Sequence, residues 1–370
     1  MNLRLSLEPY RLPLRHPWRS ARGEVRDRSG WLVVASAAGI DGFGDCAPLP
    51  EAGTETAALA RRRLQHWRDL ARAQTLGDPL AALLNALASA QSTPTPAADC
   101  AVECALLDLR ARILGLPLRQ LLAADAADRI EVNAALGAAA SLTPERLKDA
   151  AAQGFRIFKL KVGSLPAEVE LDRIRGLVQA LPSGGALRLD ANGAWDRATA
   201  ERFVAALAGL CRQGLPSDAP LIDSVEEPLA EPDDQALAAL QLAAPCAIAL
   251  DESLATGPRL LDATRDLSGL PVRRLVLKPG VLGGLRRSLE LTRRARSAGL
   301  ELVLTSLVES AAGLWATAQL AAASGSPLAH GLATADWLAR DLGPAPQPRH
   351  GGIDLPMTAG SGFEPSGPMS

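Results

Sequence analysis

The stretch that decides the fold is Phe155-Arg156-Ile157-Phe158-Lys159-Leu160-Lys161-Val162, an apolar run whose second half alternates apolar and charged residues. Such alternation with a period of two is typical of a β-strand. Comparable runs recur from residue 130 onward, and helical segments rich in Ala, Leu and Arg separate them. Together the runs occupy residues 130–136, 155–162, 187–191, 221–226, 246–251, 273–278, 300–305 and 328–332.

Eight alternating strand and helix units within about 210 residues favour a closed parallel barrel over an open sheet. We therefore predict an α/β fold with a TIM-like barrel at residues 126–340. Residues 1–125 form a separate unit, because strand candidates near the N-terminus precede helix candidates at 54–73 and 98–114. In barrels of this kind the chemistry lies at the carboxyl ends of the strands.

The composition indicates a globular protein that acts on a small molecule. Hydrophobic residues make up 48% and charged residues 22% of the 370 positions, enough for a sizeable core. The net charge of -2 and the aromatic content of 3% argue against nucleic acid or a membrane as the main partner. The N-terminus lacks a signal pattern and no long apolar run occurs, so we expect a cytoplasmic protein, compatible with a homo-oligomer.

Lysine is rare, because only four of the 39 lysine and arginine residues are lysines. A guanidinium stays protonated near neutral pH, whereas a lysine amine can lose and regain a proton. Lys159, Lys161 and Lys278 lie at the ends of strand-like runs, and Lys148 lies in a helical segment. One lysine at a strand end is often merely solvated, but three of four in that position indicate a chemical role.

Acidic residues end the runs between these lysines. Asp190, Glu226 and Asp251 lie at the ends of the third, fourth and fifth runs. A single acid there is usually a turn residue or a helix N-cap. Three carboxylates that converge near a barrel axis repel one another unless a cation neutralises them. All-oxygen ligation suits a hard ion, so we expect these three to bind Mg²⁺, with Mn²⁺ as a substitute.

The lysines are placed to move a proton beside this metal ion. Lys159 and Lys161 are two residues apart, so in a strand they point to the same face. Lys278 lies four strands further on and would face them across the barrel. A basic amine beside a metal-bound carboxylate suits removal of the proton on the adjacent carbon, so we expect a small-molecule carboxylate substrate.

Further motifs extend this pattern over most of the chain. They are Gly42-Phe43-Gly44-Asp45-Cys46-Ala47-Pro48-Leu49-Pro50 and the segments 105–109, 159–163, 189–192, 226–228, 251–253 and 278–284. Taken together, the set resembles the enolase superfamily, in particular its muconate-lactonising subgroup. The resemblance implies a (β/α)7β barrel with an α+β capping domain built from residues 1–125 and the tail 341–370. It also implies that segment 15–30 forms a loop over the site, where its arginines either bind a substrate carboxylate or are merely solvated.

The resemblance also implies roles for individual residues. Lys161 would be the general base, Lys278 would stabilise negative charge as a cation, and Lys159 would be the third lysine of the catalytic set. The metal ligands carry over to the three acids already named. Supporting residues would be Asn192 and Glu252, and substrate-binding residues would be Thr305, Ser306 and Gly331.

Within the subgroup, the chain looks most like the o-succinylbenzoate synthases of menaquinone biosynthesis. Segments 45–50, 305–310 and 330–334 resemble theirs, although Asp45 stands where many relatives have Glu. This implies a carbon–oxygen lyase that removes water from a cyclohexadiene carboxylate to give 2-succinylbenzoate.

Other activities stay open. An N-acylamino acid racemase or dipeptide epimerase would use both lysines as bases, but dipeptide epimerases typically carry Asp-x-Asp after the eighth strand, where residues 331–335 read Gly-Leu-Ala-Thr-Ala. Muconate cycloisomerase fits the cap and eighth-strand segments less well. A binding barrel without catalysis would not need all these acids and lysines, and a Schiff-base enzyme needs one desolvated lysine rather than three acids.

Overall fold

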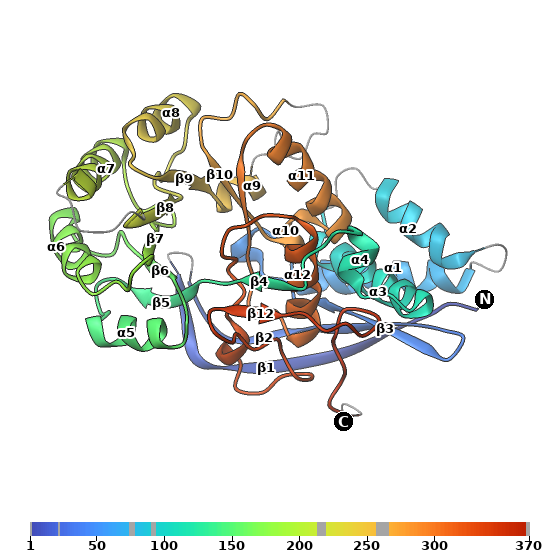
Figure 1. The fold of residues 1–370 in the computed structure, drawn as a ribbon. Helices are drawn as coiled ribbons and strands as arrows, with labels where there is room; N and C mark the ends of the chain where they lie inside the picture. Colours follow the sequence, from blue (N-terminus) through green and yellow to red (C-terminus); the bar gives the residue numbers. More distant parts are fainter. Residues whose placement is uncertain are drawn as a thin grey trace.

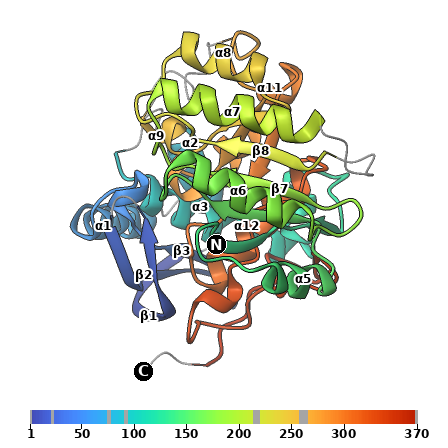
Figure 2. The ribbon, with the colours of Figure 1, turned by 90° about the vertical axis from the view of Figure 1, so that its left-hand side faces the viewer.

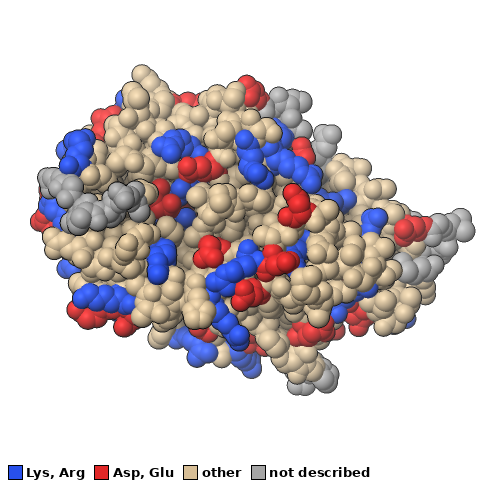
Figure 3. All heavy atoms as spheres, in the orientation of Figure 1, with Lys and Arg blue, Asp and Glu red and all other residues tan. Residues whose placement is uncertain are grey.

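The computed structural model describes residues 2–20, 23–73, 78–89, 94–212, 220–256 and 266–367. An antiparallel N-terminal sheet with its helices packs beside a curled parallel sheet that is wrapped by helices (Figure 1). Acidic and basic side chains are interspersed over the face in Figure 3. In the described part of the chain no helix is both long and apolar enough to span a membrane.

The N-terminal sheet has the order β1 (Arg4–Ser20), β2 (Gly23–Ala37) and β3 (Ile40–Cys46), with antiparallel pairing throughout. The expectation of a loop at 15–30 is wrong for the described residues, because most of them extend β1 and β2 into one long hairpin. A register shift between Pro13 and Trp18 interrupts the ladder, as expected where prolines cannot donate. Arg22 lies outside the described residues.

The helices of this part pack closely on β3. Helix α3 lies against β3, where Gly42 and Gly44 leave room for its backbone. A Cβ at Gly44 would lie 2.0 Å from the carbonyl oxygen of Ala101, so only glycine fits there. The helical segments are η1 (Pro50–Ala52), α1 (Ala57–Ala73), α2 (Pro79–Ser89), α3 (Pro96–Leu114) and α4 (Leu118–Leu122). Helices α1 and α3 confirm the two helix predictions.

The parallel sheet has seven strands within the described residues, in the order β11-β10-β9-β8-β7-β6-β5. Consecutive strands are neighbours, as repeated strand–helix units require. Seven of the eight predicted runs are therefore confirmed as sheet strands. They are β5 (Ala134–Ala138), β6 (Ile157–Lys161), β7 (Ala186–Asp190), β8 (Ile222–Glu226), β9 (Ala247–Leu250), β10 (Arg274–Leu277) and β11 (Glu301–Leu304).

The eighth run, 328–332, is not a regular strand, but it joins the two edges of the sheet. His330 pairs in parallel with Val132, and Gly331 pairs in parallel with Thr305. The amide of His330 donates to Glu131 (2.8 Å) and the amide of Gly331 donates to Leu304 (2.8 Å). Because each side contributes a single bridge, the run closes the barrel without forming a ladder.

Helices follow the strands and cover the outer side of the sheet, as α6, α7 and α8 show in Figures 1 and 2. Their buried faces are apolar, for example Phe203, Val204 and Leu207 of α7. These segments are α5 (Pro144–Ala152), α6 (Ala167–Val178), α7 (Arg197–Arg212), α8 (Asp234–Ala243), α9 (Glu252–Thr256), α10 (Pro279–Leu282), α11 (Leu285–Ser297), α12 (Ala311–Ala323) and η2 (Ala335–Trp337).

The C-terminal tail connects both parts. Strand β12 (Gly352–Asp354) pairs antiparallel with β4 (Arg129–Glu131) beside the barrel. Further on, Gly360 donates a backbone hydrogen bond to Leu116, just before α4, and accepts one from Leu118, the first residue of α4. These contacts agree with a tail that returns to the capping domain, while the boundaries at 125/126 and 340/341 stay a prediction.

A layer of charged side chains crosses the interior of the barrel below the site. Arg188 is two residues before Asp190 in β7 and so shares its face. Its Nε donates to Asp223 (2.8 Å), and Nη1 of Arg274 donates to the same carboxylate (2.5 Å). The register shift between β7 and β8 passes over Asp223, as in a β-bulge. The bulge places this carboxylate between the two guanidinium groups.

Candidate active site

The carboxyl ends of five adjacent strands bring the predicted site residues together. Lys161 ends β6, Asp190 ends β7 and Glu226 ends β8, and the three residues are direct partners across the sheet. Asp251 and Lys278 directly follow β9 and β10. Because parallel strands end at one edge, these five side chains lie at one mouth of the barrel.

Lys159 lies between two of the acids. Its Nζ is 3.0 Å from Oδ2 of Asp190 and donates a hydrogen bond to Glu226. Both carboxylates are almost fully buried. Burial by itself lowers the pKa of Lys159, but the surrounding carboxylates outweigh it, and the net effect raises this pKa. While these two carboxylates are its partners, Lys159 is therefore an ammonium rather than a base.

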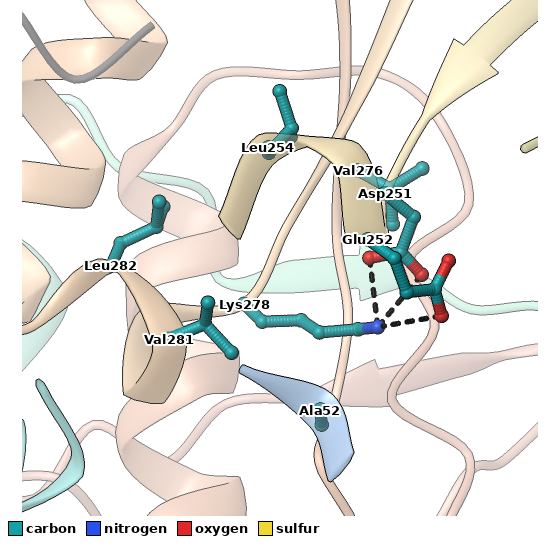
Figure 4. Close-up of a pocket in the computed structure, with 8 residues that line it drawn as sticks. All are labelled: Ala52, Asp251, Glu252, Leu254, Val276, Lys278, Val281 and Leu282. Carbon is teal, nitrogen blue, oxygen red and sulfur yellow. Dashed lines mark hydrogen bonds and ion pairs between the residues drawn. The ribbon is translucent and has the colours of Figure 1, made fainter. Parts of the chain in front are cut away.

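Lys278 is held by a second pair of acids (Figure 4). Its Nζ lies 2.7 Å from both carboxylate oxygens of Asp251 and 3.6 Å from Oε1 of Glu252. Burial disfavours the charged amine, but the attraction of Asp251 and Glu252 prevails and raises the pKa of Lys278. With these partners Lys278 is thus also an ammonium.

Lys161 is the least constrained of the three. Its side chain is 31% exposed, against 19% for Lys159 and 14% for Lys278. It donates to the side-chain oxygen of Asn192 and lies 3.9 Å from Asp190. The amide nitrogen of Asn192 in turn donates to Glu252 (3.2 Å). Asn192 therefore bridges Lys161 to the acid that faces Lys278, and its supporting role stays a prediction.

Glu227 is a residue of the site for which the sequence analysis predicted no role. It is buried and adopts φ 41°, a left-handed conformation that is uncommon outside glycine. Its Oε1 accepts from the amides of Asp251 (2.6 Å) and Ser253 (2.8 Å), and its Oε2 accepts from the Ser253 hydroxyl (2.7 Å). Glu227 fixes the backbone that carries Asp251. Its position directly after Glu226 is the sequence feature that could have indicated a role in the site.

The predicted substrate-binding residues lie where the run 328–332 meets the end of β11. The hydroxyl of Thr305 donates to the carbonyl of Gly331 (3.2 Å). A Cβ added to Gly331 would lie 2.3 Å from the hydroxyl oxygen of Thr305, so a larger residue does not fit there. The hydroxyl of Ser306 donates to Glu309 (2.7 Å) and accepts from Thr334 (3.0 Å). Both hydroxyls are thus bonded within the chain, and their contact with substrate stays a prediction.

The three acids fit a hard metal ion by their chemistry. Asp190, Glu226 and Asp251 offer only carboxylate oxygens, the ligands that Mg²⁺ and Mn²⁺ prefer. Among the described residues, no three His, Cys, Asp or Glu side chains are close enough to hold one metal ion. The ammonium groups of Lys159 and Lys278 instead neutralise the carboxylates. Metal ligation by the three acids therefore stays a prediction.

The N-terminal part reaches this mouth of the barrel. A small pocket beside Lys278 is lined by Asp251 and Glu252 on one side and by Ala52 of η1 on the other (Figure 4). Val281 and Leu282 of α10 add an apolar wall. Since Ala52 comes from the N-terminal part, that part covers the mouth of the barrel at this point.

Comparison with known proteins agrees with this architecture. Residues 6–123 match the mandelate racemase / muconate lactonizing enzyme N-terminal domain, and residues 142–368 match the enolase C-terminal domain-like family. The chain is 33% identical over 306 residues to an o-succinylbenzoate synthase of Thermosynechococcus vestitus, covering 79% of this chain and 83% of that protein. It is 27% identical over 363 residues to a hydrophobic dipeptide epimerase of Roseobacter litoralis, covering 92% and 96% respectively.

A solved structure has the same fold. The muconate lactonizing enzyme from Pseudomonas fluorescens, complexed with muconolactone, superposes with a TM-score of 0.82 at 23% identity, over 98% of this chain and 96% of that chain. Together with the two family matches, this confirms the TIM-type barrel with a separate N-terminal domain. The relatives carry three different activities at comparable identity, so they define the superfamily but not the reaction. The chain belongs to the enolase superfamily of enzymes.

Proposed function

We propose that this enzyme is an o-succinylbenzoate synthase-type lyase that depends on Mg²⁺. The observation that carries the proposal is the unequal bonding of the two lysines that face each other across the site. Lys278 is clamped between Asp251 and Glu252, whereas Lys161 contacts only a neutral amide closely and is more exposed. One available base and one fixed cation suit a dehydration on one face of the substrate, whereas a racemase needs two bases.

Asp190, Glu226 and Asp251 would hold the metal ion. Mg²⁺, when bound there, would polarise the substrate carboxylate as a Lewis acid. Lys161 would remove the proton on the carbon next to that carboxylate. Lys278, which remains an ammonium, would stabilise the negative charge that develops on the substrate.

The protonated Lys161 can complete the reaction on the same face. It would return its proton to the departing hydroxyl as the carbon–oxygen bond breaks and the ring double bond forms. The substrate loses one water in total and Lys161 ends as it began. The product of this syn elimination is 2-succinylbenzoate, and no oxidant or reductant is needed.

Deuterated water separates this proposal from the racemase alternative. The purified enzyme with Mg²⁺ would be given the cyclohexadiene carboxylate and, separately, both enantiomers of an N-acylamino acid. We expect efficient dehydration and little deuterium at the α-carbon of either enantiomer. Rapid exchange of both enantiomers beside slow dehydration would overturn the proposal in favour of racemisation.

A further inference from the structure

The turn at residues 306–310, which follows β11, donates a hydrogen bond to one side chain of the N-terminal sheet and accepts one from another. Oδ2 of Asp45, at the end of β3, accepts from the amide of Ser310 (2.7 Å). Nε of the buried Arg28, in β2, donates to the carbonyl of Val308 (3.2 Å). Val308 has φ 57°, a strained conformation for a β-branched residue. Such a conformation persists only where its surroundings hold it, and these two contacts are part of that support.

The contact of Asp45 with Ser310 also caps the N-terminus of α12, the helix that follows the turn. Ser310 is the N-cap residue of α12, but its side chain makes no capping hydrogen bond. Asp45 takes the amide of Ser310, and Asp341 takes the amide of Ala311 (2.8 Å). A Cβ on Gly313 would lie 3.1 Å from Cβ of Asp45, so the first turn of α12 packs directly on this residue. Carboxylates from elsewhere in the chain therefore cap α12.

The turn also reaches toward the catalytic lysine. Cδ1 of Leu307 lies 3.2 Å from the position that a Cβ on Gly280 would occupy. Gly280 is two residues after Lys278, and β10 and β11 are neighbouring strands. Glu309 ties the turn internally, because it accepts from the Ser306 hydroxyl and the Leu307 amide (2.5 Å). A shift of the turn would therefore move Ser306 and Leu307 at the edge of the site.

We propose that Asp45 is a positioning residue that couples the N-terminal domain to the turn at residues 306–308, at the edge of the site. Asp45 touches no reacting group, so its effect falls on how the remote part of the substrate is held rather than on proton removal. This inference rests on the proposed function, since residues 306–308 matter only if the substrate extends to them. It assigns a role to Asp45, which stands where the family resemblance leads us to expect Glu.

The test compares Asp45→Ala and Asp45→Asn with Asp41→Asn, an exposed acid in the same strand. Asp45→Ala removes the acceptor for Ser310, and we expect KM for the cyclohexadiene carboxylate to rise about tenfold while kcat changes less than about threefold. Asp45→Asn keeps an acceptor oxygen and should restore KM to near the wild-type value, and Asp41→Asn should change neither constant.

Amide hydrogen exchange over residues 306–312 gives a second readout that needs no substrate. We expect faster exchange there in Asp45→Ala than in wild type, and near-wild-type exchange in Asp45→Asn. A loss confined to kcat, or exchange that is unchanged in Asp45→Ala, would overturn the coupling. If the wild-type enzyme fails to dehydrate the substrate, the proposed function fails, and unchanged exchange remains the separate sign that the coupling is wrong.

Discussion

Replacing Asp223 by Asn tests whether the charged layer under the site stabilises the barrel. Burial alone raises the pKa of Asp223, but the guanidinium groups of Arg188 and Arg274 outweigh it and lower this pKa from 3.8 to about 2. That displacement corresponds to about 2.5 kcal/mol in favour of the carboxylate. Asp223→Asn preserves the shape and removes the charge, so it should lose this amount at neutral pH.

A larger loss would follow if the arginines were left without partners, since breaking a buried ion pair costs about 3–5 kcal/mol. Here each arginine keeps other acceptors. Arg274 still donates to Glu301 (2.9 Å), and Arg188 still donates to Asn133 (3.0 Å) and to the carbonyl of Ala329 (3.1 Å). We therefore expect the smaller figure, with a fall in Tm of roughly 3 °C.

The pH dependence gives the sharper measurement. A carboxylate whose pKa is lowered on folding stabilises the protein above its unfolded pKa, and this stability is lost as the pH falls through the folded pKa. The difference between wild type and Asp223→Asn should thus be about 2.5 kcal/mol at pH 7 and about half of that at pH 3. Urea unfolding at both pH values measures it, with the exposed Asp149→Asn in α5 as control. A difference that is independent of pH would refute the reasoning.

Three further outcomes are expected. Chelation should abolish activity, Mg²⁺ or Mn²⁺ should restore it, and Asp190→Asn should behave like chelation; full turnover of the metal-free protein would contradict the metal site. Lys161→Arg should lower turnover by several orders of magnitude with the circular dichroism spectrum unchanged, whereas Lys148→Arg, on an exposed helix face, should have no effect; near-normal turnover of Lys161→Arg would disprove the base assignment. Gly44→Ala should prevent stable packing of α3 on β3, whereas Gly209→Ala in the last turn of α7 meets no close atom and should raise stability by up to about 0.5–1 kcal/mol; equal thermal denaturation of both variants would contradict this.

The catalytic end of the barrel was predictable because two simple rules apply there. Side chains alternate along a strand, and parallel strands end at one edge, so charged residues at the ends of successive apolar runs must meet. The pairing of Lys161 with Asp190, and of Asp190 with Glu226, follows from these rules. The same rules could not give the bonding pattern of Lys278, which depends on side-chain conformations across two loops.

Two features were not predicted from the sequence: the charged layer of Arg188, Asp223 and Arg274, and the irregular closure of the barrel at residues 328–332. The inward direction of Arg188 could be predicted, since it is two residues before Asp190 in an apolar run. The rules for strand ends do not identify its partner. Asp223 comes into position only through a bulge, which a sequence does not display. The run at 328–332 has the composition of a strand, yet only His330 and Gly331 form bridges to the neighbouring strands, and composition alone does not show how many residues pair.

Buried arginines and the lysines of the barrel mouth occupy different kinds of position in this chain. Arg28, Arg119 and Arg188 are buried, and each donates to two or more acceptors at fixed positions, as a planar guanidinium can. None of them can give up its proton, so such positions stay charged whatever binds at the barrel mouth. Three of the four lysines lie at that mouth. A compact ammonium there can pair with a carboxylate, move away from it when a metal ion binds, or lose a proton. Apart from Lys148 on an exposed helix face, the lysines of this chain therefore lie where an amine that can leave its carboxylate or lose its proton is useful.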